Sequence, residues 1–217
     1  MGSLNHLAIF TRPDISLAVT KLSRFNQDAN LTHLNATRRI LKYAISTKHF
    51  TIKYGGNENN HGDIRIDGYA DADWGSDLTQ RKSTTGYIFM MNGGPISWTS
   101  KKQTTVALST MEAEYMALSD ASRELLAHLT FFNSISMEIA HPTLFTDNEA
   151  AEAIVKREPD YQRSKHIDIR YHFVRDHYEC STFNVEHIPT NEQLADILTK
   201  PLPRIKHENI VHALRLD

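Results

Sequence analysis

The chain has 217 residues, of which 40% are hydrophobic and 23% are charged, and its formal net charge at pH 7 is −2. This composition is that of an ordinary globular protein. The charge excludes the strongly basic footprint of a protein that binds nucleic acid chiefly through phosphate contacts. Nucleic-acid binding as such stays compatible with it, because acidic groups gathered at one site can mask basic patches elsewhere.

The chain carries one cysteine, Cys180, so no intramolecular disulfide can form. This fits an intracellular protein of the cytoplasm or nucleus. No apolar run approaches the roughly 18 residues of a membrane span, and the N-terminus lacks the basic and apolar segments of a signal peptide. The Met-Gly-Ser start does not fit N-myristoylation, because His6 stands where that pattern needs Ser or Thr. We therefore expect a soluble protein without membrane contact.

Residues 1 to about 48 carry helical patterns, with Pro13 and Asp14 suited to open one helix. A second helix is expected to place four apolar residues on one face, namely Leu34, Leu41, Ala44 and Ile45. A short strand is predicted at 49–54, followed by a Gly- and Asn-rich stretch typical of a linker. We place a domain boundary there and expect residues 1–60 to form a helical appendage.

Three successive strands are predicted beyond the boundary, at 64–70, 85–91 and 96–100, with Asn92-Gly93-Gly94-Pro95 as a turn. A long amphipathic helix is predicted from about 110 to 132. Its apolar stripe consists of Met111, Tyr115, Leu118, Ser122, Leu125 and Leu129.

The remaining predicted elements are a strand at 143–146, a helix after Asp147, a helix at 167–178, a strand at 183–187 and a helix at 191–199. The order is βββαβαβα with an extra helix before the last strand, so the fold class is α/β. We expect residues 61–205 to form this domain and residues 206–217 to form a C-terminal tail.

Two aspartates stand at the carboxyl ends of predicted strands, Asp71 after the first and Asp147 after the fourth, and this edge is where α/β sheets bind ligands. If the two strands are parallel neighbours, the carboxylates lie side by side and their repulsion requires a cation. Asp147 is explained equally well as a helix N-cap, and Asp71 as a turn residue. The Asp-Ala-Asp sequence at Asp71 also occurs in glycosyltransferases as a metal–nucleotide motif.

Glu112 and Glu114 lie two residues apart on the long predicted helix, so at most one is expected to face the sheet. Ser109 and Glu112 have capping-box spacing, which gives Glu112 a structural role. Glu114 lies nearer the centre of the apolar stripe. Because a buried, unpaired carboxylate needs a partner or a metal ion, Glu114 is the candidate site residue.

Two further candidates lie near the C-terminus. Asp196 is on the last predicted helix, at whose start Thr190 and Gln193 have capping-box spacing. His187 ends the last predicted strand and could exchange protons near neutral pH. Taken alone, Asp196 is better explained as a solvated helix residue, and His187 as one of twelve histidines without a special role.

The four candidate carboxylates offer only oxygen ligands, which suit a hard cation. Zinc would more often recruit Cys or His, and no Cys/His spacing typical of a zinc site is present. We therefore predict Mg²⁺ as the cofactor, with Mn²⁺ able to substitute.

Seven short sequence motifs (sequence words) follow one another in order along about residues 64–203. They are Gly68-Tyr69-Ala70-Asp71-Ala72-Asp73-Trp74, Arg81-Lys82-Ser83-Thr84-Thr85-Gly86-Tyr87, Ile96-Ser97-Trp98, Ser109-Thr110-Met111-Glu112-Ala113-Glu114-Tyr115, Thr146-Asp147-Asn148, Lys165-His166-Ile167-Asp168-Ile169-Arg170-Tyr171-His172 and Gln193-Leu194-Ala195-Asp196-Ile197. Together they closely resemble the ribonuclease H region of copia-type retrotransposon polyproteins. Gly2-Ser3-Leu4-Asn5 and Thr11-Arg12-Pro13-Asp14-Ile15 resemble the end of that family's reverse transcriptase segment.

The resemblance implies a ribonuclease H-like fold, a mixed five-stranded sheet flanked by helices. It also implies two bound Mg²⁺ ions, with Asp71 on both, Glu114 and Asp147 on one and Asp196 on the other. His187 would assist proton transfer or product release. The implied activity is endonucleolytic hydrolysis of the RNA strand of RNA–DNA hybrids by two metal ions, and the implied partners are the hybrid and a reverse transcriptase or other retroelement proteins.

Two alternatives stay open. One is a catalytically silent, domesticated ribonuclease H-like module that binds protein or nucleic acid without cutting it, and the complete carboxylate set argues against it. The other is a nuclease of the same broad fold with another substrate, such as a DNA exonuclease. The copia-like sequence words argue against that one.

Overall fold

The protein is described here by a computed structural model that covers residues 1–55, 64–77, 79–140, 142–156 and 165–216. Four helices come first: α1 (Gly2–Phe10), the 3₁₀ helix η1 (Pro13–Ile15), α2 (Ser16–Ser23) and α3 (Leu31–Ser46). The strands are β1 (Ile66–Asp73), β2 (Thr84–Met91), β3 (Gly94–Lys102), β4 (Thr143–Thr146) and β5 (Asn184–His187). The later helices are α4 (Thr110–Ser134), α5 (Glu149–Lys156), α6 (Lys165–Glu179), α7 (Asp196–Thr199) and α8 (Arg204–Ala213).

The five strands form one mixed sheet in the order β3-β2-β1-β4-β5. β1 is central, because it pairs antiparallel with β2 and parallel with β4, and β5 continues the parallel half. The parallel β1–β4 pair is joined by the crossover helix α4, the arrangement expected to bring Asp71 and Asp147 together. This architecture confirms the ribonuclease H-like α/β fold expected from the sequence.

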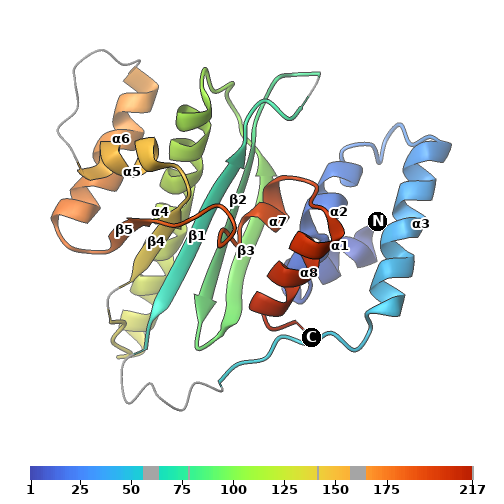
Figure 1. The fold of residues 1–217 in the computed structure, drawn as a ribbon, viewed down its shortest axis with the longest axis horizontal. Helices are drawn as coiled ribbons and strands as arrows, with labels where there is room; N and C mark the ends of the chain where they lie inside the picture. The colour runs from blue at the N-terminus through green and yellow to red at the C-terminus, as the bar shows by residue number, and fades with distance from the viewer. Residues whose placement is uncertain (56–63, 78, 141, 157–164, 217) are drawn as a thin grey trace.

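Helices α4, α5 and α6 lie on one side of the sheet (Figure 1). The predicted stripe of α4 packs there, with Tyr115, Leu118 and Leu125 fully buried. Ile66 and Ala70 of β1 belong to the same core. Because side chains alternate along a strand, Asp71 points to the opposite face of the sheet.

The opposite face is covered by α7, α8 and the N-terminal helices (Figure 1). A second core gathers there, formed by Ile88, Met90, Ala195, Ile197, Leu198, Ile210, Val211, Leu214 and Leu216. Residues 206–217, expected as a tail, thus contribute most of α8 and several buried side chains. The predicted helix at 191–199 is reduced to the four residues of α7, because Gln193 bonds to β1 and Pro201 cannot continue a helix.

Residues 49–54 are not a strand, contrary to the prediction. Two of their backbone amides pair with the end of the chain: Thr51 N–H donates to Leu216 O at 2.9 Å, and Lys53 N–H donates to Arg215 O at 3.2 Å. The strand-like sequence pattern of residues 49–54 is explained by this pairing with residues 215 and 216, which lie outside the strands of the sheet.

The N-terminal helices have a small core of their own, formed by Leu4, Ala8, Ile15, Val19 and Ile40. They dock on the sheet at β3, where Trp98 Nε1–H donates to Ala8 O at 2.7 Å. Contacts from η1 and α2 also reach α7.

The predicted apolar face of α3 is wrong. Leu34, Leu41 and Ile45 are exposed, whereas Ile40 is buried against α1 and α2. A polar contact explains the rotation, because the Tyr43 hydroxyl donates to the buried carboxylate of Asp14 at 2.9 Å. That bond turns the Ile40 and Tyr43 side of the helix inward.

We predict that residues 1–60 provide no metal ligand and that their deletion leaves hybrid cleavage measurable. The reason is that the four candidate carboxylates all lie beyond residue 60. The measurement is cleavage by the truncated chain, beside circular dichroism and hybrid binding. A truncated chain that folds and binds hybrid but cuts nothing would contradict the prediction.

Among the residues that the structure describes, none of the helices combines the length and the apolar character needed to cross a membrane.

Candidate active site

Asp71 lies near the end of β1, under α7, with only 1% of its surface exposed. Thr199 Oγ1–H donates a hydrogen bond to Asp71 Oδ2, whereas Asp71 Oδ1 is buried without a hydrogen-bond partner. Burial raises the pKa of Asp71 to about 6; nearby Lys200 opposes the rise, and Asp196 and Asp147 add to it. The charged form of Asp71 therefore needs a nearby cation.

Asp147 directly follows β4, the parallel neighbour of β1. The adjacent residue Asn148 caps α5, since its Oδ1 accepts the Ala151 N–H at 3.0 Å. The explanation of Asp147 as the N-cap is therefore wrong, because Asn148 fills that position. The Asp147 carboxylate instead lies near that of Asp71.

The two glutamates in the first turns of α4, Glu112 and Glu114, are both buried, but they have different partners. Glu112 Oε2 accepts the Leu108 N–H at 2.8 Å, and Ser109 Oγ accepts the Glu112 N–H at 3.1 Å. Glu112 thus stabilises the start of α4, as its spacing predicted. Glu114 Oε2 accepts the Ala72 N–H of β1 at 3.1 Å, so Glu114 is the one that contacts the sheet.

Glu114 shares the electrostatic environment of the two aspartates. Burial raises its pKa well above the ordinary range, and repulsion from Asp71 and Asp147 raises it further. A carboxylate held among like charges in a buried position is typical of a site that binds a cation.

Asp196 is the first residue of α7 and is fully buried, so its explanation as a solvated helix residue is wrong. The predicted capping box of Thr190 and Gln193 is also wrong. The buried Gln193 side chain instead donates from Nε2 to Ala70 O of β1 at 3.0 Å. This bond ties the start of α7 to the strand that carries Asp71.

A glycine lets α7 approach the sheet this closely. Gly86 of β2 pairs with Asp71, and a Cβ added there would lie 2.6 Å from Thr199 Cγ2 and 2.8 Å from Leu198 Cβ. A larger residue would have to push α7 away, and Asp196 with it.

The three aspartates converge although they come from distant parts of the chain. One carboxylate oxygen from each of Asp71, Asp147 and Asp196 lies within 4.8 Å of the others. Glu114 adjoins them through its bond to Ala72, the residue after Asp71. The structure thus brings together three of the four carboxylates singled out in the sequence, and the fourth, Glu114, is bonded to the strand residue next to Asp71.

Two lysines, which the sequence did not single out, accompany the carboxylates. Lys200 Nζ lies 2.7 Å from Asp196 Oδ1 and 3.6 Å from Asp71 Oδ1. Lys206 of α8 pairs with Asp196 Oδ2. Burial disfavours the ammonium of Lys200, but the nearby Asp71 and Asp196 raise its pKa above the ordinary value.

The donor set fits a hard divalent cation. Asp71 Oδ1 is buried without a hydrogen-bond partner, and the nearest ammonium group, Lys200 Nζ, lies 3.6 Å away. Buried polar atoms of this kind call for a ligand, and carboxylate oxygens are the atoms that Mg²⁺ and Mn²⁺ prefer.

His187 ends β5 opposite Thr146, the residue before Asp147, so it lies at the same edge of the sheet. It is exposed, and its backbone N–H donates to Glu152 Oε1 at 3.2 Å. The structure thus places His187 on a neighbouring strand at the rim of the carboxylate cluster. Sequence reasoning missed the roles of Thr199, Lys200 and Lys206, and it assigned Gln193 to a capping box instead of to its bond with β1.

No protein-family model matches the chain. Its curated relatives include the retrovirus-related Pol polyproteins of transposon TNT 1-94 from Nicotiana tabacum, 39% identical over 208 residues, and of transposon RE2 from Arabidopsis thaliana, 38% identical over 211 residues. Each match covers 96% of this chain but only 15% and 14% of the respective relative. The secreted RxLR effector protein 161 of Plasmopara viticola is 46% identical over 124 residues, 57% of this chain and 84% of that protein.

Among solved structures, the chain is similar to the N-terminal ribonuclease H domain of a Mycobacterium tuberculosis protein, with a TM-score of 0.46 and 13% identity over 70% of this chain and 99% of that one. The relatives that match nearly the whole of the chain are retrovirus-related Pol polyproteins of transposons, in agreement with the resemblance that the sequence words carry. The chain therefore belongs to the family of copia-type retrotransposon Pol polyproteins, as a short ribonuclease H-like part of their length.

Proposed function

We propose that the chain is a metal-dependent endonuclease that hydrolyses the RNA strand of RNA–DNA hybrids. The observation that carries this proposal is the convergence of the carboxylates of Asp71, Asp147 and Asp196, with Glu114 beside them. The chain covers only 15% and 14% of its two Pol relatives. The proposal therefore concerns the activity of this chain and not that of the whole polyproteins. A reverse transcriptase or another retroelement protein is its proposed partner.

The proposed roles are those that the family resemblance implies. Asp71 would bind two ions; Glu114 and Asp147 would share one of them and Asp196 would bind the other. Bound divalent ions supply Lewis acidity, which activates the attacking water and stabilises the leaving 3′-oxygen. Thr199 orients Asp71 through its hydrogen bond.

The anchoring bonds hold the carboxylates in place before any ion binds. Glu114 is fixed to the β1 backbone at Ala72, and Gln193 fixes the start of α7 at Ala70. Both backbone groups flank Asp71, so the two anchors hold neighbouring carboxylates against the same strand. Such preorganised ligands do not have to be gathered when the ions bind.

His187→Ala is expected to slow hybrid cleavage without abolishing it. An exposed histidine at the rim can pass protons or ease product release, and water can partly replace it; general acid–base catalysis typically contributes about 10²–10⁴-fold. The measurement is the single-turnover rate in Mg²⁺. His172→Ala, which changes a histidine of α6, serves as the control. Complete loss of cleavage in His187→Ala alone would contradict the rim role.

The test of the proposed function is cleavage of labelled RNA–DNA hybrid in Mg²⁺, beside single-stranded RNA, duplex RNA and duplex DNA. We expect cleavage of the RNA strand of the hybrid and loss of this cleavage in EDTA. A folded protein that binds hybrid without cutting it would favour the silent interaction module instead. Cleavage of duplex DNA in preference to hybrid would favour the DNA nuclease.

A further inference from the structure

The Asp196 carboxylate is ion-paired with two ammonium groups, those of Lys200 and Lys206. Lys200 Nζ lies 2.7 Å from Oδ1, and Lys206 Nζ pairs with Oδ2, so both oxygens of the fully buried carboxylate are already ion-paired. A divalent ion on either oxygen would come close to both ammonium groups, and the like charges would repel each other strongly in a partly buried site. The ion and at least one lysine therefore compete for Asp196.

Of the two lysines, Lys206 is the one that can leave. Lys200 contacts two site carboxylates, Asp196 and Asp71, and lies on the backbone immediately after α7. Lys206 contacts one of them and comes from a separate helix, α8. Its only other contact among the hydrogen bonds of the described residues is to the carbonyl oxygen of Thr190, at 3.1 Å.

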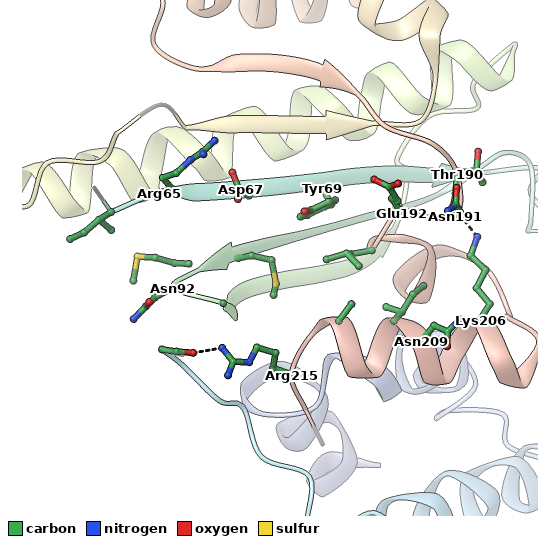
Figure 2. A pocket seen from close by; sticks show the side chains of 18 of the residues that line it. Arg65, Asp67, Tyr69, Asn92, Thr190, Asn191, Glu192, Lys206, Asn209 and Arg215 are labelled. Atoms are coloured by element: carbon green, nitrogen blue, oxygen red, sulfur yellow. Dashed lines mark hydrogen bonds between the residues drawn. The ribbon is translucent and has the colours of Figure 1, made fainter. Parts of the chain in front are cut away.

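The surroundings of Lys206 offer it another place. Lys206 lines a groove of about 1710 Å³ between α8 and the sheet, on the face of β1 and β2 that also carries Asp71. Figure 2 shows Lys206 on the wall of this groove, with its bond to Thr190 and with Glu192 nearby on the loop before α7. The exposed carboxylate of Glu192 can receive an ammonium group that has left Asp196.

We propose that Lys206 is a resident counter-ion of the metal-free site, which the divalent ion displaces from Asp196 into this groove. The inference rests on the proposed function, because it assumes that Asp196 binds an ion. In the metal-free protein Lys206 stabilises the buried charge of Asp196, and it weakens ion binding by the same interaction. Lys206 thereby sets how much free Mg²⁺ the site needs.

The first measurement is calorimetric titration of Lys206→Met with Mn²⁺ and Mg²⁺ in the absence of nucleic acid. Met keeps the length and apolar stem of the side chain and removes the charge. Because a competing cation is gone, ion affinity is expected to rise about tenfold. Lys206→Arg keeps the charge and is expected to bind the ion with wild-type affinity.

The second measurement is thermal melting with EDTA and with Mn²⁺. In EDTA, Lys206→Met is expected to melt below the wild type, because Asp196 loses one partner. With Mn²⁺ it is expected to regain stability by a larger upward shift than the wild type. If Lys206→Met does not fold in EDTA, Lys206→Gln replaces it, since an amide can still donate to Thr190 O.

Arg204→Met is the matched control. It removes a positive charge from the same helix, where Arg204 is solvent-exposed and pairs with Glu208 at 2.7 Å. If Lys206→Met binds ions no more tightly than Arg204→Met, while the wild type binds ions and cuts hybrid, the inference fails and the proposed function stands. If neither the wild type nor Lys206→Met binds an ion, the proposed function fails and the inference with it.

Discussion

Asp71→Asn is expected to reduce the single-turnover rate of hybrid cleavage in Mg²⁺ by at least about 10³-fold, since a ligand proposed to bind both ions is worth several kcal/mol in the transition state. Asn keeps the size of Asp and can still accept the hydrogen bond from Thr199. The fold should therefore persist, as circular dichroism will show. Wild-type cleavage by Asp71→Asn would refute the proposed site.

The same variant is expected to raise the melting temperature of the metal-free protein. The pKa of Asp71 in the folded protein is about 6, above the unfolded value of about 3.9. The folded state thus binds the carboxyl proton of Asp71 more tightly than the unfolded state does. The free energy of unfolding therefore falls as the pH rises from about 4 through about 6. Asn removes that loss, so the gain measured in EDTA should be larger near pH 8 than near pH 5.

Asp67→Asn is the matched control for the cleavage measurement. Asp67 lies four residues earlier on β1 and on the same face of the sheet. Burial raises its pKa too, but it is not one of the convergent carboxylates. The Asp67→Asn variant should cut hybrid at the wild-type rate. A loss of cleavage as large as that of Asp71→Asn would show that removing any charge on β1 is enough to inactivate the protein.

Glu114→Gln is expected to lose hybrid cleavage by at least about 10²-fold, whereas Glu112→Gln keeps it. In each variant the amide oxygen can still accept the backbone hydrogen bond, from Ala72 in one case and from Leu108 in the other. Only the charge is removed, from two buried residues of the same helix. The difference in rate therefore reports which glutamate binds the ion.

Two readouts accompany this pair, single-turnover cleavage and calorimetric Mn²⁺ binding. Glu114→Gln should lose both, and its metal-free form should melt no lower than the wild type, because a carboxylate with a raised pKa is destabilising when charged. The reverse result, with Glu112→Gln inactive and Glu114→Gln active, would exchange the two assignments.

The parts of the fold that the sequence predicted are those with local periodicity. The stripe of α4 predicted its buried face, and capping-box spacing distinguished Glu112 from Glu114. The same spacing misled at Thr190 and Gln193. There the Gln193 amide bonds to Ala70, 123 residues away in the chain, and no local pattern reports such a contact.

The lysines of the site were missed for a related reason. Lys200 and Lys206 are ordinary surface residues by sequence, and their importance arises only when α7 and α8 pack on the sheet. Residues 206–217 did contain a signal that could have predicted α8, because Ile210, Val211 and Leu214 recur at helical spacing. With that helix recognised, Lys206 would have been placed on its first turns.

The anchoring of α7 on β1 has a consequence for protein synthesis. Thr199 and Asp71, which bond to each other, are 128 residues apart in the chain. Once β1, α4 and β4 have emerged from the ribosome, the nascent chain carries three of the carboxylates. It does not yet carry Asp196 or either lysine. The site is thus completed only when translation has passed α7, so an interrupted or truncated polypeptide is not expected to cut its nucleic acid.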